Sequence, residues 1–455
     1  MKKYLKVFQY HEDYMEYKSS DSFLKPNVSE CMNEGDLHYN PFKWADEYLT
    51  FKALEGGSFT LNIGSAVSTS ILESISYSTD NGQSWETTNN VDGETVTIVT
   101  PTVNAGDSVL WKGLGSGVST VTNNNNRPST SSMFSSTGTF NVEGNILSLL
   151  YGDEFEGKDS VTGTYNFAFL FYADKSRVSD VPKVVSAKNL VLPIKNTPEG
   201  CYLRMFQEYQ LEEYTLVEAP LRIDSESVGA SACTSMFYSC TNLTTAPELP
   251  ATTLANYCYA SMFYGCTNLT TAPELPATTL SNNCYRDMFE GCTSLTTAPE
   301  LPATTLAQQC YQYMFKSCTS LTTAPALPAT TLAQTCYEEM FNGCTSLTTA
   351  PELPATTLAN SCYEWMFQNC TSLTTAPELP ATTLATGCYN FMFYGCTSLN
   401  YIKAMFTTTP SYTYTREWVS GVASTGTFVK NSAATWNVSG VHGIPTGWTV
   451  ETASS

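Results

Sequence analysis

A block of 26 residues is written almost unchanged along the second half of the chain. One copy contains GCTSLTTAPELPATTLANSC, from Gly343 to Cys362, and nearly the same letters begin at Gly265 and Gly291. Three series recur with a step of 26: cysteines at 240, 266, 292, 318, 344, 370 and 396, cysteines at 258, 284, 310, 336, 362 and 388, and leucines at 243, 269, 295, 321, 347, 373 and 399. Such a period is the signature of a solenoid, in which each unit buries its apolar face only against its neighbours.

The segment CYASMFYGC, from Cys258 to Cys266, has the spacing of one face of a helix. At about 100° per residue, five side chains fall inside an arc of about 140°: Cys258, Tyr259, Met262, Phe263 and Cys266. These letters are the same in every full copy, whereas the letters between them change. We therefore predict a helix whose constant face is buried and whose changing face is exposed.

The two cysteine series predict a structural ladder inside the core. Its members are Cys258, Cys266, Cys284, Cys292, Cys310, Cys318, Cys336, Cys344, Cys362, Cys370, Cys388 and Cys396. Free cysteine packs as a small hydrophobe, so we favour buried, reduced thiols. Like cysteines in stacked coils lie about 5 Å apart, which a disulfide can span, so disulfide staples remain an alternative. A zinc site is a third interpretation. However, zinc sites use cysteine pairs two to four residues apart, whereas the spacings here alternate between 8 and 18.

The rest of each unit, LTTAPELP in the copy that starts at Leu269, is predicted to be a short strand closed by proline. One glutamate recurs in this part of the unit: Glu248, Glu274, Glu300, Glu352 and Glu378. Like charges stacked about 5 Å apart repel unless water or a cation separates them. We expect a solvated edge, with calcium bridging as the alternative.

Four parts can be separated along the chain. Residues 1–50 are predicted to be a leader or attachment module. Residues 51–195 alternate apolar and polar letters between turns such as Asp80–Gly82, which predicts an all-β, sandwich-like domain. Residues 196–400 are the repeat array, and residues 401–455 break the pattern as a C-terminal cap must. The predicted fold class is therefore β-rich: an all-β sandwich-like domain followed by an α/β solenoid of 26-residue units with caps.

The residues that catalysis, metals and nucleic acids need are scarce. A net charge of −20 opposes binding to nucleic acid or to an anionic membrane surface. The chain has three histidines, and none lies at a usable spacing from a nucleophile or carboxylate. The stretch STDNGQSW, from Ser78 to Trp85, fits a structural Asp-box hairpin. We therefore expect no enzyme activity, no cofactor and no metal site.

Targeting signals are weak in this sequence. No run of 18 apolar residues occurs, so no transmembrane helix is predicted. The first residues begin like a signal peptide, but Lys6 interrupts the apolar stretch and His11–Asp13 ends it, so we expect no secretory signal. Only 14% of the residues are charged, and Thr, Ser, Asn and Tyr are abundant, which suits a secreted or virion surface protein.

The unit MFxGCTSLTTAPELPATTLAxxCYxx resembles the BspA-like (Treponema-type) leucine-rich repeat. In that family an aromatic pair, a cysteine, a leucine and a closing proline recur in the same order. The resemblance covers residues 196–400 and implies a right-handed solenoid with a curved sheet on one face and a role in adhesion. The unit of 26 residues is longer than the family's usual unit. The leader and the flanking stretches YSTDNGQSW and AGDSVLWKG resemble structural proteins of gut Bacteroidetes and their phages.

We therefore expect a non-enzymatic phage virion surface protein, in the head or a tail fibre, that displays the leucine-rich-repeat solenoid to the host cell surface or its glycans. Such a protein leaves the cell by lysis and needs no signal. The alternative is a bacterial BspA-like cell-surface adhesin. Expected partners are other virion proteins at the N-terminal region, a host protein or glycan at the solenoid, and further copies in a homo-oligomer. The candidate partner-binding residues, all expected to be exposed, are Tyr264, Arg286, Tyr313, Trp365, Phe391 and Tyr394.

Overall fold

The computed structural model describes residues 44–65, 67, 71–89, 95–119, 131–175, 181–211 and 213–453. Over these residues the chain is β-rich, as the sequence predicted, and has very few helices. The described helices are the four-residue α2 (Ser148–Tyr151) and α3 (Tyr412–Thr415) and the 3-10 helix η3 (Gly152–Glu154). Almost all of the predicted leader, residues 1–50, lies outside the described residues.

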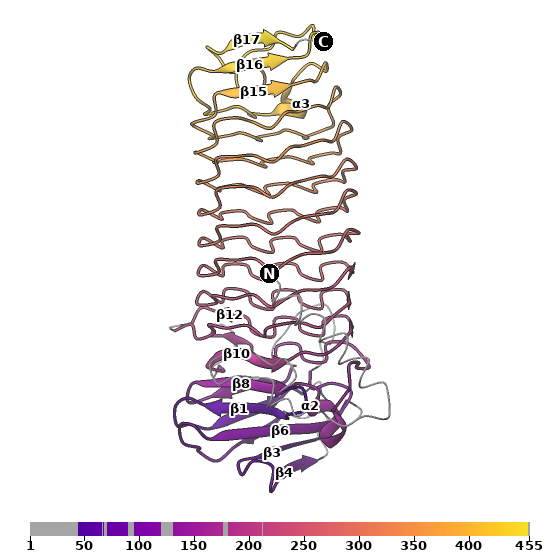
Figure 1. Ribbon diagram of the computed structural model, residues 1–455, viewed down its shortest axis with the longest axis vertical. Helices are drawn as coiled ribbons and strands as arrows, with labels where there is room; N and C mark the ends of the chain where they lie inside the picture. Colours follow the sequence, from indigo (N-terminus) through magenta and orange to yellow (C-terminus); the bar gives the residue numbers. More distant parts are fainter. Residues whose placement is uncertain are drawn as a thin grey trace, which may run out of the picture. The chain divides into compact units, whose positions relative to one another are not determined.

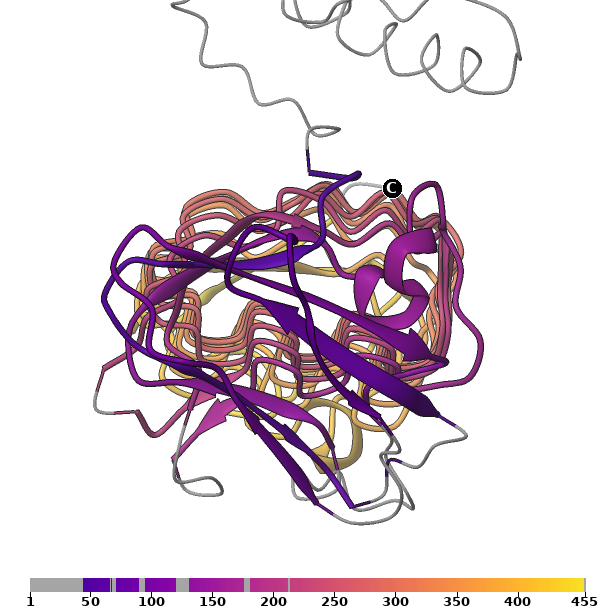
Figure 2. The same ribbon diagram turned by 90° about the horizontal axis from the view of Figure 1, so that it is seen from below.

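The N-terminal part of the described chain contains two β-sheets (Figure 2). One sheet has the strand order β10-β8-β1-β6-β3-β4, with β10 at Val184–Val191, β8 at Phe140–Asn145, β1 at Leu49–Ala53, β6 at Ser108–Gly115, β3 at Leu72–Ser78 and β4 at Glu86–Asn89. The other has the order β5-β2-β7, with β5 at Val96–Val99, β2 at Phe59–Ile63 and β7 at Met133–Ser136. Strands β1, β2 and β6 bury alternate side chains, because successive residues of a strand point to opposite faces.

Aromatic rings fill the space between these two sheets. Phe51 of β1 packs against Phe134 of β7 with ring centroids 4.6 Å apart, and against Phe59 of β2 at 5.3 Å. Trp111 of β6 lies 4.9 Å from Phe134. Each edge-to-face pair of this kind adds about 0.5–1.5 kcal/mol to the stability gained from burial alone. The sheets therefore share one aromatic core.

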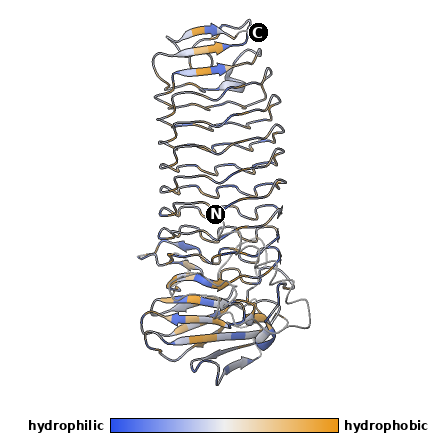
Figure 3. Cartoon of the chain, in the orientation of Figure 1, coloured by the Kyte–Doolittle hydropathy of each residue, from blue (hydrophilic) through white to orange (hydrophobic). Residues whose placement is uncertain are grey.

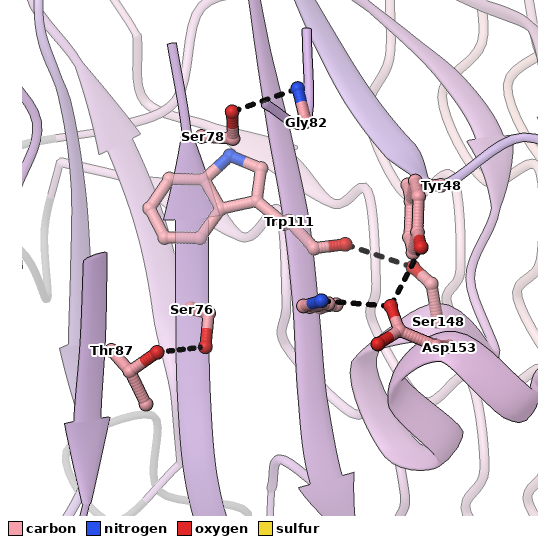
Figure 4. A network of polar contacts seen from close by, with 9 residues as sticks. Tyr48, Ser76, Ser78, Gly82, Thr87, Trp111, Ser148 and Asp153 are labelled. Carbon is pink, nitrogen blue, oxygen red and sulfur yellow. Dashed lines mark hydrogen bonds and ion pairs between the residues drawn. The ribbon is translucent and has the colours of Figure 1, made fainter. Parts of the chain in front are cut away.

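Polar contacts tie the short helix to the larger sheet (Figure 4). The Ser148 hydroxyl accepts a hydrogen bond from the Leu49 amide and donates one to the Trp111 carbonyl, both at 2.9 Å. Asp153 accepts from the Tyr48 hydroxyl at 2.6 Å and pairs with Lys112 at 2.7 Å. These contacts fix the helix across two neighbouring strands.

The stretch Ser78–Trp85 forms a tight turn between β3 and β4. Ser84 donates to Asp80 through its amide, at 2.9 Å, and through its hydroxyl. The Ser78 hydroxyl donates to Asp80 at 2.7 Å. It also accepts from the Gly82 amide at 2.9 Å (Figure 4). The hydrogen bonds from Ser84 and Ser78 lower the pKa of Asp80 to about 2. The carboxylate therefore has a structural role in this hairpin.

Beyond the two sheets, the chain winds in coils that stack along the long axis of this unit (Figure 1). We call the stretch Ala255–Cys266, and its equivalents every 26 residues, the turn wall. Alternate amides of the turn wall donate to the next coil, as Tyr259 does to the Cys284 carbonyl at 3.0 Å. The amides between them close turns within the same coil, as Met262 does to the Tyr259 carbonyl at 3.2 Å.

The helix predicted for Cys258–Cys266 is therefore wrong. A helix would satisfy its amides within the segment, whereas here half of them bond the neighbouring coil. The backbone also takes a left-handed φ at every fourth residue: +59° at Tyr257, +53° at Ser261 and +70° at Gly265. A turn that repeats every four residues has nearly the period of a helix, which is 3.6 residues. The side chains that were predicted to face inward are therefore buried all the same.

The other side of each coil has little regular strand. The described strands there are β11 (Asn196–Thr197), β13 (Ser227–Val228) and β14 (Thr253–Leu254), whereas β9 (Ala173–Asp174) and β12 (Glu208–Tyr209) pair with each other on the turn wall. Most coils are joined on this side by single parallel bridges between equivalent threonines, such as Thr271 with Thr297 and Thr279 with Thr305. Prolines interrupt the ladder, because proline has no N–H to donate. The two threonine pairs of each coil, for example at 270–271 and 278–279, are exposed and form the threonine rows.

The two sheets continue into the stack without a break. Strand β10 pairs in parallel with β8 and bridges onward to residue Glu218 in the first coil. On the turn wall, the Phe134 amide of β7 donates to the Leu170 carbonyl, and the Phe171 amide donates to the Met205 carbonyl. Coil hydrogen bonding thus begins near Tyr165, and the predicted boundary between residues 195 and 196 lies inside a continuous ladder.

Constant side chains stack in columns inside the coils. Neighbouring rings in the phenylalanine column from Phe237 to Phe393 lie 5.5 to 5.8 Å apart, and those in the tyrosine column from Tyr259 to Tyr389 lie 5.8 to 6.0 Å apart. One hydrophobic cluster runs from Leu49 to Trp448. In Figure 3, the strands at both ends of this cluster carry both apolar and polar residues.

The fifteen cysteines of the described residues are free and buried, including all twelve of the predicted ladder. In the series from Cys240 to Cys396, each thiol lies 2.9 to 3.1 Å from a phenylalanine carbonyl of the preceding coil and donates to it, as Cys266 does to Phe237. Burial raises the pKa of these thiols. Cysteine thus supplies a small donor inside an apolar column.

Cys233, which falls out of phase with the other cysteines, has a structural explanation. Its amide donates to the carbonyl of Cys258 in the next coil. Tyr259 makes the equivalent hydrogen bond to the coil that follows its own, so Cys233 occupies the position of the tyrosine in its coil. Ala232 then takes the position of the cysteine. The register of the backbone is therefore unbroken, and only the side chains of the two columns differ.

The last coils replace the repeated columns by tryptophan. Strands β15 (Tyr401–Ala404), β16 (Thr427–Lys430) and β17 (Thr449–Thr452) pair in parallel and in register. The Trp418 indole lies 6.1 Å from Phe393, the last ring of the phenylalanine column, and donates to the Gly443 carbonyl at 2.9 Å. Large rings thus cover the final repeat.

We expect the thiols of the stack to be unreactive in the folded protein, because a buried thiol with a raised pKa supplies almost no thiolate. Alkylation without reductant, read by peptide mass spectrometry, should leave the cysteines from Cys201 to Cys396 unmodified in buffer and modify all of them in 6 M guanidinium. Cysteines that stay blocked in guanidinium until a reductant is added would be disulfide-bonded and would contradict the reduced ladder.

Removing one ring from the phenylalanine column should be costly. We expect Phe315→Ala to lower the free energy of unfolding by about 3–5 kcal/mol, through lost burial and the cavity left behind. Thr323→Ala, at an exposed position of the threonine rows, should change it by less than about 0.5 kcal/mol. Urea denaturation of both variants makes the comparison, and equal losses would show that the column is not the source of stability.

Candidate binding surface

Three adjacent columns of the turn wall, which lie between its constant tyrosine and its second constant cysteine, form what we call the variable strip. The first column contains Ala260, Arg286, Gln312, Glu338, Glu364 and Asn390. The second contains Ser261, Asp287, Tyr313, Glu339, Trp365 and Phe391. The third contains Tyr264, Glu290, Lys316, Asn342, Gln368 and Tyr394. No two coils carry the same three residues, although the buried residues beside them are identical.

The six candidate residues predicted from sequence all lie on this strip, but they are less accessible than expected. Tyr264, Arg286, Tyr313, Trp365 and Tyr394 are half-buried rather than fully exposed. Phe391 is buried, with 8% of its surface accessible, so its predicted exposure is wrong. Stacked coils bring neighbouring members of a column within contact distance, and the residues therefore cover one another.

Tyrosine rings dominate the N-terminal end of the strip. Tyr264 stacks on Tyr238 of the preceding coil, with ring centroids 4.6 Å apart and planes within 3°. Tyr209, which is 37% exposed, meets Tyr238 edge-on at 6.1 Å. This end of the strip therefore presents ring edges and hydroxyls.

The C-terminal end of the strip is also aromatic. Trp365 stacks on Phe391 at 3.8 Å, and Tyr394 meets Phe391 at 6.1 Å. The Arg416 guanidinium lies over Phe391 at 5.1 Å and over Tyr412 at 4.6 Å. Neighbours within the chain therefore pack against these rings.

The centre of the strip is ionic, a feature that the sequence prediction missed. Lys316 pairs with Glu339 at 2.9 Å and with Glu290 at 3.9 Å, and its ammonium lies 4.9 Å from the Tyr313 ring. Arg286 also lies over that ring, 5.5 Å from its centroid. The signal was present in the sequence, since Glu290, Lys316 and Glu339 share the columns of the six candidates, but Arg286 was the one charged residue among those predicted.

Burial perturbs the central carboxyls. It raises the pKa of Glu290 and of Glu338 to about 7, although Lys316 opposes the shift at Glu290 and a hydrogen bond from Gln312 opposes it at Glu338. The pKa of Asp287 is also raised by burial. Near neutral pH the centre of the strip therefore holds a mixture of charged and protonated carboxyls.

The second column has an unfavourable backbone conformation. Its members take left-handed φ angles, +59° at Tyr313, +59° at Trp365 and +54° at Phe391. This region costs a residue with a side chain roughly 1–2 kcal/mol, and glycine adopts it freely. The left-handed position four residues on is glycine in four of the six coils and the one four residues earlier is glycine in one of them, whereas the second column contains no glycine. The side chains of the second column are thus present despite their conformational cost.

The glutamates of the repeated ELP segment lie on a different face from the strip. Glu274, Glu300 and Glu352 are exposed, Glu248 pairs with Arg222 at 2.9 Å, and Glu378 pairs with Lys403 at 2.9 Å. Within the part of the chain that the structure describes, no three Asp, Glu, His or Cys side chains converge as they would around a metal ion.

Comparison with known proteins agrees with this repeat. The family model for the BspA type leucine rich repeat region matches residues 230–374 and 308–417, with six copies. Residues 230–417 therefore form a BspA type leucine rich repeat region, which suggests a surface or extracellular, adhesin-like protein. No curated protein and no solved structure matches the chain. None of the described helices has the length and apolar character needed to cross a membrane.

We expect stability to fall as the pH rises from about 4.5 to about 7. Burial raises the pKa of Glu208, Glu290 and Glu338 from 4.5 to about 7, so the folded chain holds protons in this window that the unfolded chain has released. Urea denaturation at pH 5 and pH 7.5 measures the difference in the free energy of unfolding. Glu→Gln at the three sites should reduce this difference. The paired change Glu274→Gln and Glu300→Gln is the control and should leave it unchanged.

Proposed function

We propose that this protein is a non-enzymatic attachment protein whose repeats form a leucine-rich-repeat solenoid that displays the variable strip to a binding partner. One observation carries the proposal. The threonine rows are as exposed as any part of the coils, yet they are the same in nearly every copy, whereas the strip differs in every copy. Variation therefore does not follow exposure alone, and it is concentrated on the turn wall.

The backbone of the second column supports the same conclusion. A protein that needed only a stable stack would favour glycine at a left-handed position. Instead the column carries Tyr313, Trp365 and Phe391, at a conformational cost, on a rigid scaffold. Strain that is kept in a repeated structure is typical of binding sites, where stability is exchanged for function.

We place this function on the surface of a phage virion, with the region before the stack contacting other virion proteins and further copies of the chain. The resemblance of the leader and flanking stretches to phage structural proteins supports this placement. A bacterial BspA-like cell-surface adhesin is the second candidate, and the family of the repeats supports it equally. Both placements use the strip in the same way, toward a host protein or glycan.

The strip should be needed for attachment but not for folding. We expect Tyr313→Gly to weaken binding of the full chain to its host cells by about tenfold, as loss of a central aromatic contact does. Tyr313→Ala should bind equally poorly but be roughly 1 kcal/mol less stable than the glycine variant, because alanine cannot relieve the left-handed backbone. Flow cytometry with labelled protein measures binding, and Thr323→Ala is the control. Unchanged binding by both Tyr313 variants would refute the proposal.

The location is tested by protein mass spectrometry of two purified fractions. A virion protein should be found in particles purified on a density gradient and be depleted from the bacterial outer membrane. Presence in the membrane fraction and absence from particles would instead establish the adhesin.

A further inference from the structure

The charge and hydrogen-bonding pattern of the variable strip point to a class of partner. Resting on the function proposed above, we propose that the four central coils of the strip bind a cationic, lysine- or arginine-rich segment of a protein. These coils contain Arg286, Gln312, Glu338 and Glu364 in the first column, with the corresponding residues of the second and third columns.

The central coils carry an excess of negative charge that the chain does not neutralise. They contain five acidic and two basic side chains. Both basic residues are already engaged, Lys316 with Glu339 and Glu290, and Arg286 with Asp287 at 3.4 Å. Among the described residues, no basic group lies within ion-pair distance of Glu338 or Glu364. Two carboxyls in consecutive coils therefore remain available to an outside cation.

A buried acceptor in the same column also has no partner. Gln312 is only 4% exposed, and its amide nitrogen donates to Glu338 at 2.7 Å. Its Oε1 atom receives no hydrogen bond. Buried polar atoms normally have a partner, and an exception calls for an explanation. An ammonium or guanidinium that reaches Glu338 would bring further donors to this column.

The aromatic residues favour a polypeptide over a sugar. A sugar stacks on a free ring face, but Phe391 covers one face of Trp365 and Tyr238 covers one face of Tyr264. Both Arg286 and Lys316 lie over the Tyr313 ring. These contacts leave less ring face for a sugar, whereas the hydroxyls and carboxylates of the strip suit the side chains and backbone of an extended peptide. Equivalent residues recur about every 4.8 Å along the strip, so successive cations of one segment can each meet a coil.

An octalysine peptide tests the proposal, with binding to the full chain measured by isothermal titration calorimetry in 150 mM salt. We expect Glu338→Gln combined with Glu364→Gln to weaken binding about tenfold, since two charge-assisted contacts are lost. Glu274→Gln combined with Glu300→Gln is the matched control. It removes the same charge from two consecutive coils outside the strip, and we expect it to weaken binding less than about twofold.

Several outcomes would overturn this assignment. The assignment is wrong if the chain does not bind the peptide or if both double variants weaken binding equally. It is also wrong if the variant with Glu338→Gln and Glu364→Gln binds the peptide with unchanged affinity. Loss of a bound neutral oligosaccharide in the strip variant would assign the strip to glycans instead. If the double variant unfolds, the single substitution Glu364→Lys, at a half-buried site, serves the same purpose. It is expected to weaken binding of the peptide. If the peptide fails but Tyr313 still governs attachment to cells, the cationic partner is refuted and the attachment function stands.

Discussion

The hydrogen bonds that join each coil to the next are the constraint on which the structure depends. In the turn wall every second amide donates to the coil that follows, always in the same register. That register places each side chain against its own copies one repeat away. Columns of identical phenylalanine, tyrosine, leucine and cysteine are the result, because a residue that packs well against its equivalent can be used in every coil. The buried thiols fit the same rule, since each one donates to a carbonyl of the preceding coil while occupying little volume.

Much of the fold followed from the spacing of the letters. The 26-residue step predicted stacked units, and the pairing of Cys258, Tyr259, Met262, Phe263 and Cys266 on one face predicted which residues are buried. Local structure was harder, because a turn that repeats every four residues and a helix of period 3.6 place the same side chains inward. Only the glycine at 265, 291, 343 and 395 hinted at left-handed backbone, and it was read as an ordinary variable position.

The continuity of the two sheets with the stack could not be seen from composition. The stretch around Phe167–Phe171 lacks the cysteines and the threonine pairs of the repeat, yet its backbone bonds the first coil as the repeats bond one another. Side-chain exposure on the strip was misjudged for a related reason. The prediction treated each coil alone, whereas Trp365 covers Phe391 only because the next coil lies in contact.

The molecule thus separates two tasks. Constant columns hold the coils together, and three outward columns differ from coil to coil on a backbone that penalises some of their side chains. Such a division lets the surface change without loss of the scaffold, as in other stacked-repeat proteins. It also means that the order of the strip residues along the stack, and not only their composition, should determine what the protein binds.

The most direct test of whether the order of the strip residues determines binding is to exchange these residues between two coils. In one coil the substitutions are Arg286→Glu, Asp287→Trp and Glu290→Gln. In the other coil they are Glu364→Arg, Trp365→Asp and Gln368→Glu. Composition, net charge and every constant column stay the same. If recognition lies in the strip, the exchanged protein should keep its circular dichroism spectrum and lose about tenfold or more of its affinity for host cells. Attachment at the affinity of the native chain would contradict this account.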